Sequence, residues 1–294
     1  MNKLATFFIS LLLFSTLTTF AQKDQTNSFS PVGLTIIVND LSISSNWYKE
    51  NLNFRVHKKM PERRILQRGD FYIELRAIKG SLNEKDIKLP EDFKFINGYS
   101  KFSFVVDNLK GLYNHLFING VNVFRPITKG EFFQGEYFVI TDPDGNYLQF
   151  FSNGDSDIKI NDIQMKPFLI SKMVGDLDES VKWYQSILNC NISEILDIPE
   201  HNLKLGYLEL NGFYFELIQT GVSLNKTDLD KFKDKHIQGF CNLTFYVDDI
   251  KTTVSSMGTD EFPVNNNIEP ADFNGFKKQV NIKDLSGNNI QIIN

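Results

Sequence analysis

The chain has 294 residues, a formal net charge of −5 and 41% hydrophobic residues, which is typical of a globular protein with room for two ordinary domains. The mildly negative charge, without any run of Lys and Arg, gives no sign of a nucleic-acid partner. Phe is common, with 27 residues, so we expect a largely aromatic core.

The first 21 residues are predicted to form a signal peptide. A single Lys precedes an apolar and hydroxyl-bearing stretch, and Thr19-Phe20-Ala21 offers the small residues that suit cleavage after Ala21. The alternative is an uncleaved anchor helix, because the uncharged stretch 4–22 could just span a bilayer. We favour cleavage, since the stretch is rich in Thr and Ser. The mature protein is then expected to be periplasmic or secreted, with no membrane span.

The rest of the chain repeats itself at an offset of about 140 residues. The matching segments keep their order: "NDLSISSNWYKENLNFRV" from Asn39 with "GDLDESVKWYQSILNCNI" from Gly175, "FYIEL" from Phe71 with "FYFEL" from Phe213, "FSFVVDNLK" from Phe102 with "LTFYVDDIK" from Leu243, and "TDPDGNYLQFF" from Thr141 with "KDLSGNNIQII" from Lys283. Two homologous modules follow, 31–155 and 165–294, joined by a polar stretch.

Each module also repeats within itself. A strand that ends in Asp, at Asp40 and again at Asp107, leads into a helix, and the Asp side chain is a natural helix N-cap. Short strands separated by Gly, Asn and Asp follow each helix. The sequence therefore predicts an α+β fold with four copies of a strand-helix-strand-strand-strand unit.

These motifs resemble the vicinal oxygen chelate superfamily, which includes glyoxalase, bleomycin-resistance proteins and extradiol dioxygenases. The resemblance rests on the Val-x-Asp-Leu segments, the Trp-Tyr helices, the aromatic-x-Glu-Leu strands and the closing Asp-Pro-Asp-Gly strand, and it covers nearly the whole mature chain. It implies cup-shaped mixed sheets made of paired βαβββ units, with the helices outside. In that family each module pairs two units around one cup, but the sequence leaves the pairing of these four units open.

Strand alternation divides the predicted sheets into an apolar face and a polar face. The apolar, packed face is expected to carry Leu34, Ile36, Val38, Ile73, Leu75, Phe102, Phe104, Val106, Leu148 and Phe150 in the first module, and Phe213, Phe215, Leu217, Leu243, Phe245, Val247, Ile290 and Ile292 in the second. Lys172 breaks this pattern, and the sequence offers no reason for it. We interpret the polar faces as ligand-binding cups; the alternative is that they are solvent-facing sheet surfaces.

The resemblance also locates the family's usual metal site, which takes His or Gln, Glu, His and Glu from four strands. The corresponding positions are Gly33, Glu74, Lys101 and Gln149 in the first module, and Leu169, Glu216, Asn242 and Gln291 in the second. Gly and Leu have no donor atom and an ammonium repels a cation, so neither set predicts tight binding of a transition metal. None of the four His residues falls at these positions, and His57 and His201 are expected at the surface.

One ion pair and one shifted pKa are predicted from this arrangement. Lys101 is expected to replace the metal and to pair with Glu74 across the first cup. Glu216, with only amides and hydroxyls expected around it, is predicted to have a pKa raised by burial, so that it could act as a general base. Cys190 and Cys241 are interpreted as two small core residues, with a disulfide as the alternative.

The sequence thus favours an exported protein that binds or sequesters a small polar or aromatic molecule in its cups, without a cofactor. The alternative is a lyase, isomerase or dioxygenase of glyoxalase type with a metal-free or divergent metal site based on Glu74 or Glu216. The candidate ligand-binding residues are Tyr72, Arg76, Lys101, Ser103, Tyr147, Gln149, Tyr214, Asn242, Tyr246 and Gln291. Beyond this ligand, we expect a monomer or homodimer and no nucleic-acid partner.

Overall fold

The computed structural model describes residues 28–77, 98–130, 135–152, 162–221, 239–264, 267–271, 273 and 275–294. The predicted signal peptide lies outside these residues, as does most of the predicted linker. Within the described ranges, no helix is long and apolar enough to cross a membrane.

Four βαβββ units follow one another along the chain, as the sequence predicts. The first contains β1 (Ser30–Val38), α1 (Leu41–Leu52), β2 (Arg55–Met60), β3 (Arg63–Arg68) and β4 (Phe71–Ala77). The second contains β5 (Gly98–Val106), α2 (Leu109–Ile118), β6 (Val123–Lys129), β7 (Glu136–Thr141) and β8 (Tyr147–Ser152). The third contains β9 (Met165–Met173), α3 (Leu177–Leu188), β10 (Asn191–Ile198), the 3₁₀ turn η3 (Pro199–His201), β11 (Leu203–Leu210) and β12 (Phe213–Thr220). The fourth contains β13 (Gly239–Tyr246), α5 (Ile250–Ser255), β14 (Glu269–Pro270), β15 (Lys278–Lys283) and β16 (Asn289–Ile293).

The helices begin where the strand-end polar residues predict, with one exception. Asp40 caps α1 by accepting from the backbone N–H of Ser42 at 2.7 Å, and Asp176 caps α3 in the same way. The prediction that Asp107 caps α2 is wrong, because Asn108 takes that place and accepts from the N–H of Gly111. Asp107 instead accepts from the backbone N–H of Gln164.

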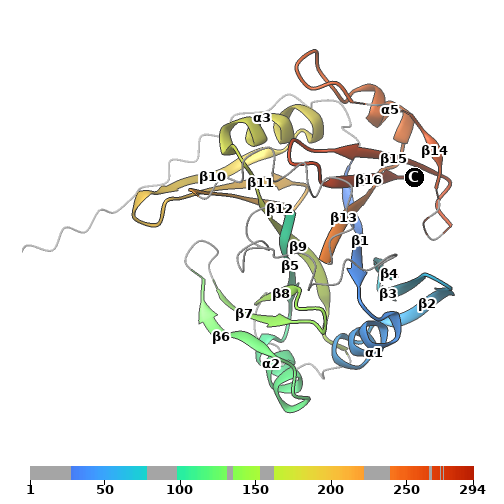
Figure 1. The fold of residues 1–294 in the computed structure, drawn as a ribbon, viewed down its shortest axis with the longest axis vertical. Helices are drawn as coiled ribbons and strands as arrows, with labels where there is room; N and C mark the ends of the chain where they lie inside the picture. Colours follow the sequence, from blue (N-terminus) through green and yellow to red (C-terminus); the bar gives the residue numbers. More distant parts are fainter. Residues whose placement is uncertain are drawn as a thin grey trace, which may run out of the picture.

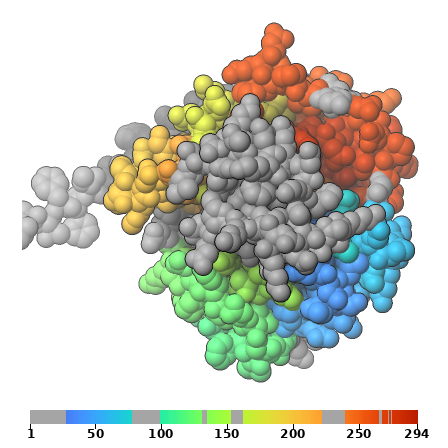
Figure 2. All heavy atoms as spheres, viewed as in Figure 1, coloured from blue at the N-terminus to red at the C-terminus, as the bar shows by residue number. Residues whose placement is uncertain are grey.

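The four units form two eight-stranded mixed sheets, and each sheet takes one unit from each module (Figure 1). Sheet A has the order β14-β15-β16-β13-β1-β4-β3-β2, which joins the first unit to the fourth. Sheet B has the order β10-β11-β12-β9-β5-β8-β7-β6, which joins the second to the third. Pairing within a module, as the resemblance implies, is therefore wrong for this chain. In Figure 2 the blue first unit borders both the orange-red fourth unit and the green second unit, and the strand pairing assigns it to a sheet with the fourth.

The apolar faces of the two sheets pack against each other in one continuous core. Every residue predicted for the packed face is at most 1% exposed, which confirms the assignment of faces. The core is aromatic where the sheets meet: Phe71 of sheet A stacks on Phe102 of sheet B with ring centroids 5.5 Å apart, and Phe213 of sheet B meets Phe245 of sheet A at 5.8 Å.

Each module is held together across this core by its Asp-x-x-Gly turn. The turn between β7 and β8 docks on α1, where the Tyr48 hydroxyl donates to Asp142 at 2.8 Å and the Ser44 hydroxyl donates to Asp144 at 2.6 Å. The turn between β15 and β16 docks on α3 in the same way, with the Tyr184 hydroxyl donating to Asp284 at 3.0 Å. The aspartates of "DPDG" and "DLSG" are therefore anchors between helix and turn.

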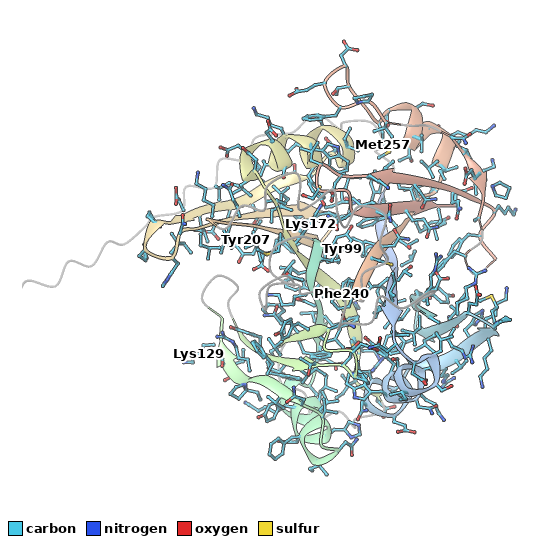
Figure 3. The ribbon with its side chains drawn as sticks, viewed as in Figure 1. Tyr99, Lys129, Lys172, Tyr207, Phe240 and Met257 are labelled. Atoms are coloured by element: carbon cyan, nitrogen blue, oxygen red, sulfur yellow. The ribbon has the colours of Figure 1, made fainter. Side chains whose placement is uncertain are left out.

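Lys172, which broke the apolar pattern, is explained by the second anchor. Its ammonium is almost fully buried, forms an ion pair with Asp284 and lies 3.2 Å from the Tyr184 hydroxyl oxygen. It also lies over the Tyr99 ring, 5.8 Å from the centroid, near the centre of the molecule in Figure 3. Cys190 and Cys241 are free thiols, the first buried and the second partly buried, so the alternative of a disulfide is wrong.

Candidate functional site

The polar face of each sheet forms a cup, and the strand register makes the two cups equivalent position by position. We call the face of sheet A with Glu74 and Asn242 cup A, and the face of sheet B with Glu216 and Lys101 cup B. One row runs Glu74, Thr35, Asn242, Asn289 in cup A and Glu216, Ser171, Lys101, Tyr147 in cup B. The next row runs Tyr72, Gly33, Thr244, Gln291 in cup A and Tyr214, Leu169, Ser103, Gln149 in cup B.

Both cup floors are polar and buried. Less than a tenth of the surface of each of these residues is exposed: Thr35, Glu74, Thr244 and Gln291 in cup A, and Ser103, Gln149, Ser171 and Glu216 in cup B. A solvent-facing sheet surface does not bury its hydroxyl, amide and carboxylate groups in this way. The alternative of bare, solvated sheet faces is therefore wrong for the cup floors.

In cup A the carboxylate of Glu74 is held by two arginines. Arg63 on β3 lies 3.1 Å from Oε1, and Arg76 on β4 lies 3.0 Å from Oε2. The Thr35 hydroxyl adds a longer contact to Oε2 at 3.4 Å. The predicted pairing of Glu74 with Lys101 is wrong, because the two residues lie in different sheets.

In cup B Lys101 pairs with Glu216 instead, with 3.2 Å between Nζ and Oε2. The Ser171 hydroxyl donates to Oε2 and the Tyr207 hydroxyl donates to Oε1 at 2.8 Å. Burial raises the pKa of Glu216, but the Lys101 ammonium and these hydrogen bonds together outweigh burial and hold the pKa below its ordinary value. The predicted raised pKa is therefore wrong, and Glu216 is a stable carboxylate.

The other predicted site residues lie on the expected faces but are divided between the cups. Cup A takes Tyr72, Arg76, Asn242, Tyr246 and Gln291, and cup B takes Lys101, Ser103, Tyr147, Gln149 and Tyr214. The amides differ in their partners. Gln291 accepts from Thr244 and donates to Gln279 at 2.9 Å, whereas Gln149 accepts from Ser103 at 3.1 Å.

Three residues of the cups were missed by sequence reasoning: Arg63, Tyr207 and Phe273. Tyr207 faces Glu216 because the two-residue turn Asn211-Gly212, with both φ angles positive, fixes the register of β11 and β12. The Asn-Gly pair is visible in the sequence, and the turn it predicts would have placed Tyr207 opposite Glu216. We see no comparable signal for Phe273.

Phe273 fills the middle of cup A. A Cβ atom on Gly33 would lie only 3.0 Å from the tip of its ring, which itself is 2% exposed. The ring packs edge-on against Tyr72 at 5.8 Å and stacks on Phe276 at 6.1 Å. The side chain that would project from the first ligand position of cup A is thus replaced by an aromatic ring.

Neither cup fits a divalent metal. With the observed pairing, the four ligand positions are Gly33, Glu74, Asn242 and Gln291 in cup A, and Leu169, Glu216, Lys101 and Gln149 in cup B. Each cup offers one carboxylate, already engaged by cations of the protein, and neutral amides, which are weak ligands for transition metals. Within the described residues, no group of three or more His, Cys, Asp and Glu side chains could hold a metal ion.

Two features outside the cups, the exposed histidines and a surface hollow, do not make a second candidate site. His57 and His201 are exposed, as predicted. The hollow lies between the end of α1 and β2, lined by Lys49 and residues 53–59. Its cationic side chains are solvated, which is the ordinary state of surface charges.

The chain matches the family model described as Glyoxalase/Bleomycin resistance protein/Dioxygenase superfamily over residues 30–150 and 168–292. It therefore belongs to this superfamily, and the two matched segments are tandem vicinal oxygen chelate modules, each of which contributes one unit to each sheet.

Among solved structures, glyoxalase I from Zea mays is similar with a TM-score of 0.65 and 16% identity, covering 91% of this chain and 93% of the other. A putative dioxygenase from Bacillus subtilis is similar with a TM-score of 0.62 and 13% identity, covering 90% and 85%. At such identities the likeness concerns the fold alone. Comparison with curated protein sequences gives no significant match.

Proposed function

We propose that this chain is a metal-independent binding protein for a small polar or aromatic molecule, and that cup B is the cup it uses. One observation carries the proposal. The Lys101 ammonium lies 3.2 Å from the Glu216 carboxylate, at a position where enzymes of the family usually have a metal ligand. A fixed cation of the protein thus stands where a metal ion would need a donor atom.

Cup B is preferred over cup A because of what covers the two floors. In cup A the Phe273 ring lies over Gly33, and two arginines close the Glu74 carboxylate. In cup B the equivalent of Gly33 is Leu169, and Lys101 keeps about a quarter of its side chain exposed. The charged group in the centre of cup B is therefore partly accessible, whereas an aromatic ring covers Gly33 in cup A.

Binding is preferred over proton-transfer catalysis because of the state of the carboxylates. A general base at neutral pH is most effective when its pKa is raised toward 7. The pKa of Glu216 is lowered, and Glu74 lies between two arginines. A lyase, isomerase or dioxygenase using either residue is therefore the less favoured function.

Elemental analysis of the natively prepared protein, combined with ligand-detected NMR across a metabolite and antibiotic panel, tests the proposal. We expect far less than one metal ion per chain and at least one bound small molecule, with binding weakened in Lys101→Ala and retained in the matched cup A variant Asn242→Ala. Stoichiometric metal that is lost in Glu216→Ala or Glu74→Ala would favour the enzymatic alternative. A panel without any binder would remove the main support for a binding protein.

We further propose that the protein acts after export, as a monomer or homodimer. The support for export is the cleavable pattern of residues 1–21 in the sequence. Mass spectrometry of the protein recovered from the native host should find an N-terminus at Gln22, and light scattering gives the oligomeric state. Recovery of the intact N-terminus in the membrane fraction would favour the anchor helix instead.

A further inference from the structure

We infer that cup B binds an amphiphilic organic acid, with an anionic, hydrogen-bond-accepting head at Lys101 and Gln149 and an aromatic or branched apolar body against the wall formed by β11 and β12. This inference rests on the proposed function and names the class of ligand for it. It comes from comparing which hydrogen-bonding groups remain available in the two equivalent cups.

The floor of cup B has hydrogen-bond donors, on Lys101 and Gln149, that lack an acceptor among the described residues. The Glu216 oxygens are filled by Tyr207, Ser171 and Lys101. Lys101 has three N–H donors, and Glu216 is its one acceptor within the described residues. Gln149, 4% exposed, accepts from Ser103 with its carbonyl, while its NH₂ group finds no acceptor in the described part of the chain. A ligand that satisfies this floor must offer acceptor oxygens.

Cup A shows the opposite balance, so spare donors are not a general consequence of the fold. There the NH₂ group of Gln291 already donates to Gln279 at 2.9 Å. The one buried side-chain atom without a partner among the described residues is an acceptor, Oδ1 of Asn242. Asn242 occupies the position equivalent to Lys101. An anionic head would therefore find a cation in the centre of cup B and an amide oxygen in the centre of cup A.

The wall beside the cup B floor is apolar. Leu169, Leu205 and Tyr207 form a small hydrophobic cluster of their own, separate from the main core, and Ile218 and Tyr214 pack against it. Phe168 extends this surface, with its ring 5.3 Å from that of Tyr214 and 5.2 Å from that of Phe151. Burial of an apolar ligand body against such a surface contributes favourable free energy of binding.

The same wall in cup A is basic, which shows that the apolar wall is particular to cup B. Arg63 and Arg76 are cross-strand partners on β3 and β4, at the positions that Leu205 and Ile218 occupy on β11 and β12. In cup A these arginines hold Glu74. In cup B two aliphatic side chains replace them, and the cation stands on the floor as Lys101. The exchange leaves this side of cup B apolar and puts the cation, paired with Glu216, in the centre of the floor.

Titration with 2-naphthoate, the isosteric neutral 2-naphthamide and acetate tests the inference, with NMR shifts of the protein as readout. We expect 2-naphthoate to bind at least about tenfold more tightly than either other probe, because a charge-assisted hydrogen bond and apolar burial are each lost in one of them. Lys101→Asn, which installs the cup A residue, should remove the preference for the carboxylate over the amide. Ile218→Gln should weaken naphthoate binding, and Arg76→Gln, the matched change in cup A, should not.

The outcomes separate the ligand class from the proposed function. Unfolding midpoints of the variants establish that each is folded before its binding is compared. Tighter binding of 2-naphthamide, or of a sugar such as glucose, with a dependence on Lys101 would overturn the organic acid and leave cup B as a binding site. Naphthoate binding that persists unchanged in folded Lys101→Asn would also overturn the inference. If no member of the wider panel binds the protein, both the class and the proposed function fail.

Discussion

The two cups share a backbone register and a glutamate, and they differ in where the countercharge stands. In cup A the cations come from the wall, as Arg63 and Arg76, and the centre of the floor is the neutral Asn242. In cup B the cation comes from the centre of the floor, as Lys101, and the wall is aliphatic. Both buried glutamates pair with a cation, but the fold does not dictate the position of that cation. The position of the cation decides whether the charged groups of the cup pair only with one another or leave hydrogen-bond donors available to a ligand.

The same freedom appears at the two helix anchors. Asp142 and Asp284 are equivalent turn residues that receive a tyrosine hydroxyl from α1 and α3, respectively. No cation among the described residues pairs with Asp142, and burial raises its pKa, against hydrogen bonds from Asn146 and Tyr48 that lower it. Asp284 instead pairs with Lys172. Here too the carboxylate is retained in both halves, and the cation is present in only one.

The largest expected effect comes from removing the carboxylate at the anchor that has a cation. Asp284→Asn leaves the buried Lys172 ammonium without its partner and should lower the free energy of unfolding by about 3–5 kcal/mol, as breaking a buried ion pair does. Asp142→Asn leaves no buried cation without a partner, and it should lower the free energy of unfolding by only about 1–2 kcal/mol, through weakened hydrogen bonds. Urea denaturation at pH 7 measures both values.

The pH dependence of Asp284→Asn provides its control. Burial lowers the pKa of Lys172 below its ordinary value of 10.5. Without Asp284, the folded chain therefore binds fewer protons than the unfolded chain between the lowered pKa of Lys172 and 10.5, and stability should recover as the pH rises toward 10.5. Equal losses in the two variants, or no recovery with pH, would show that the two anchors do not differ in charge.

A smaller effect is expected where Phe273 meets Gly33. Gly33→Leu installs the residue that cup B has at this position, but the new side chain collides with the Phe273 ring. Overpacking of this kind lowers the free energy of unfolding by about 1–3 kcal/mol. In the double variant Gly33→Leu/Phe273→Ala the collision is absent, so the two changes should be strongly non-additive in a double-mutant cycle. Additive losses would mean that the ring does not occupy the cup.

Much of this architecture could be predicted from the sequence because it is repeated four times. The periodic apolar residues on the strands placed both packed faces, and Asp40 located the start of α1. The glutamates Glu74 and Glu216 were placed on the polar faces because each lies between apolar residues of an aromatic-x-Glu-Leu strand. Local alternation is enough for these assignments, since the side chains of a strand change face at every residue.

The partners of those residues could not be predicted in the same way, because they depend on which units share a sheet. Pairing within a module puts Lys101 beside Glu74, whereas the observed pairing puts it beside Glu216. The four units are alike, so no local pattern distinguishes the two arrangements. The pKa of Glu216 was predicted in the wrong direction for the same reason, since the missing neighbour was the Lys101 ammonium.

The smallest expected effect is the pH dependence that Lys101 gives to cup B. Because the pKa of Glu216 in the folded chain lies below its ordinary value of 4.5, the folded chain binds fewer protons than the unfolded chain just below that value. The stability contributed by Glu216 is therefore complete above about pH 5 and is lost as the pH falls through the lowered pKa. Lys101→Asn should remove about 1 kcal/mol or less at pH 7, since the ammonium is partly exposed, and progressively less as the pH falls toward 3 and Glu216 takes up a proton. Asn242→Ala, the matched change in cup A, should leave the slope of stability against pH unchanged between these limits. The midpoints of urea denaturation from pH 3 to pH 7, measured for the unmodified protein and these two variants, test the prediction. The difference in the free energy of unfolding between Lys101→Asn and the unmodified protein could instead stay constant with pH. That result would mean that Lys101 stabilises cup B by packing and that its charge does not stabilise the Glu216 carboxylate.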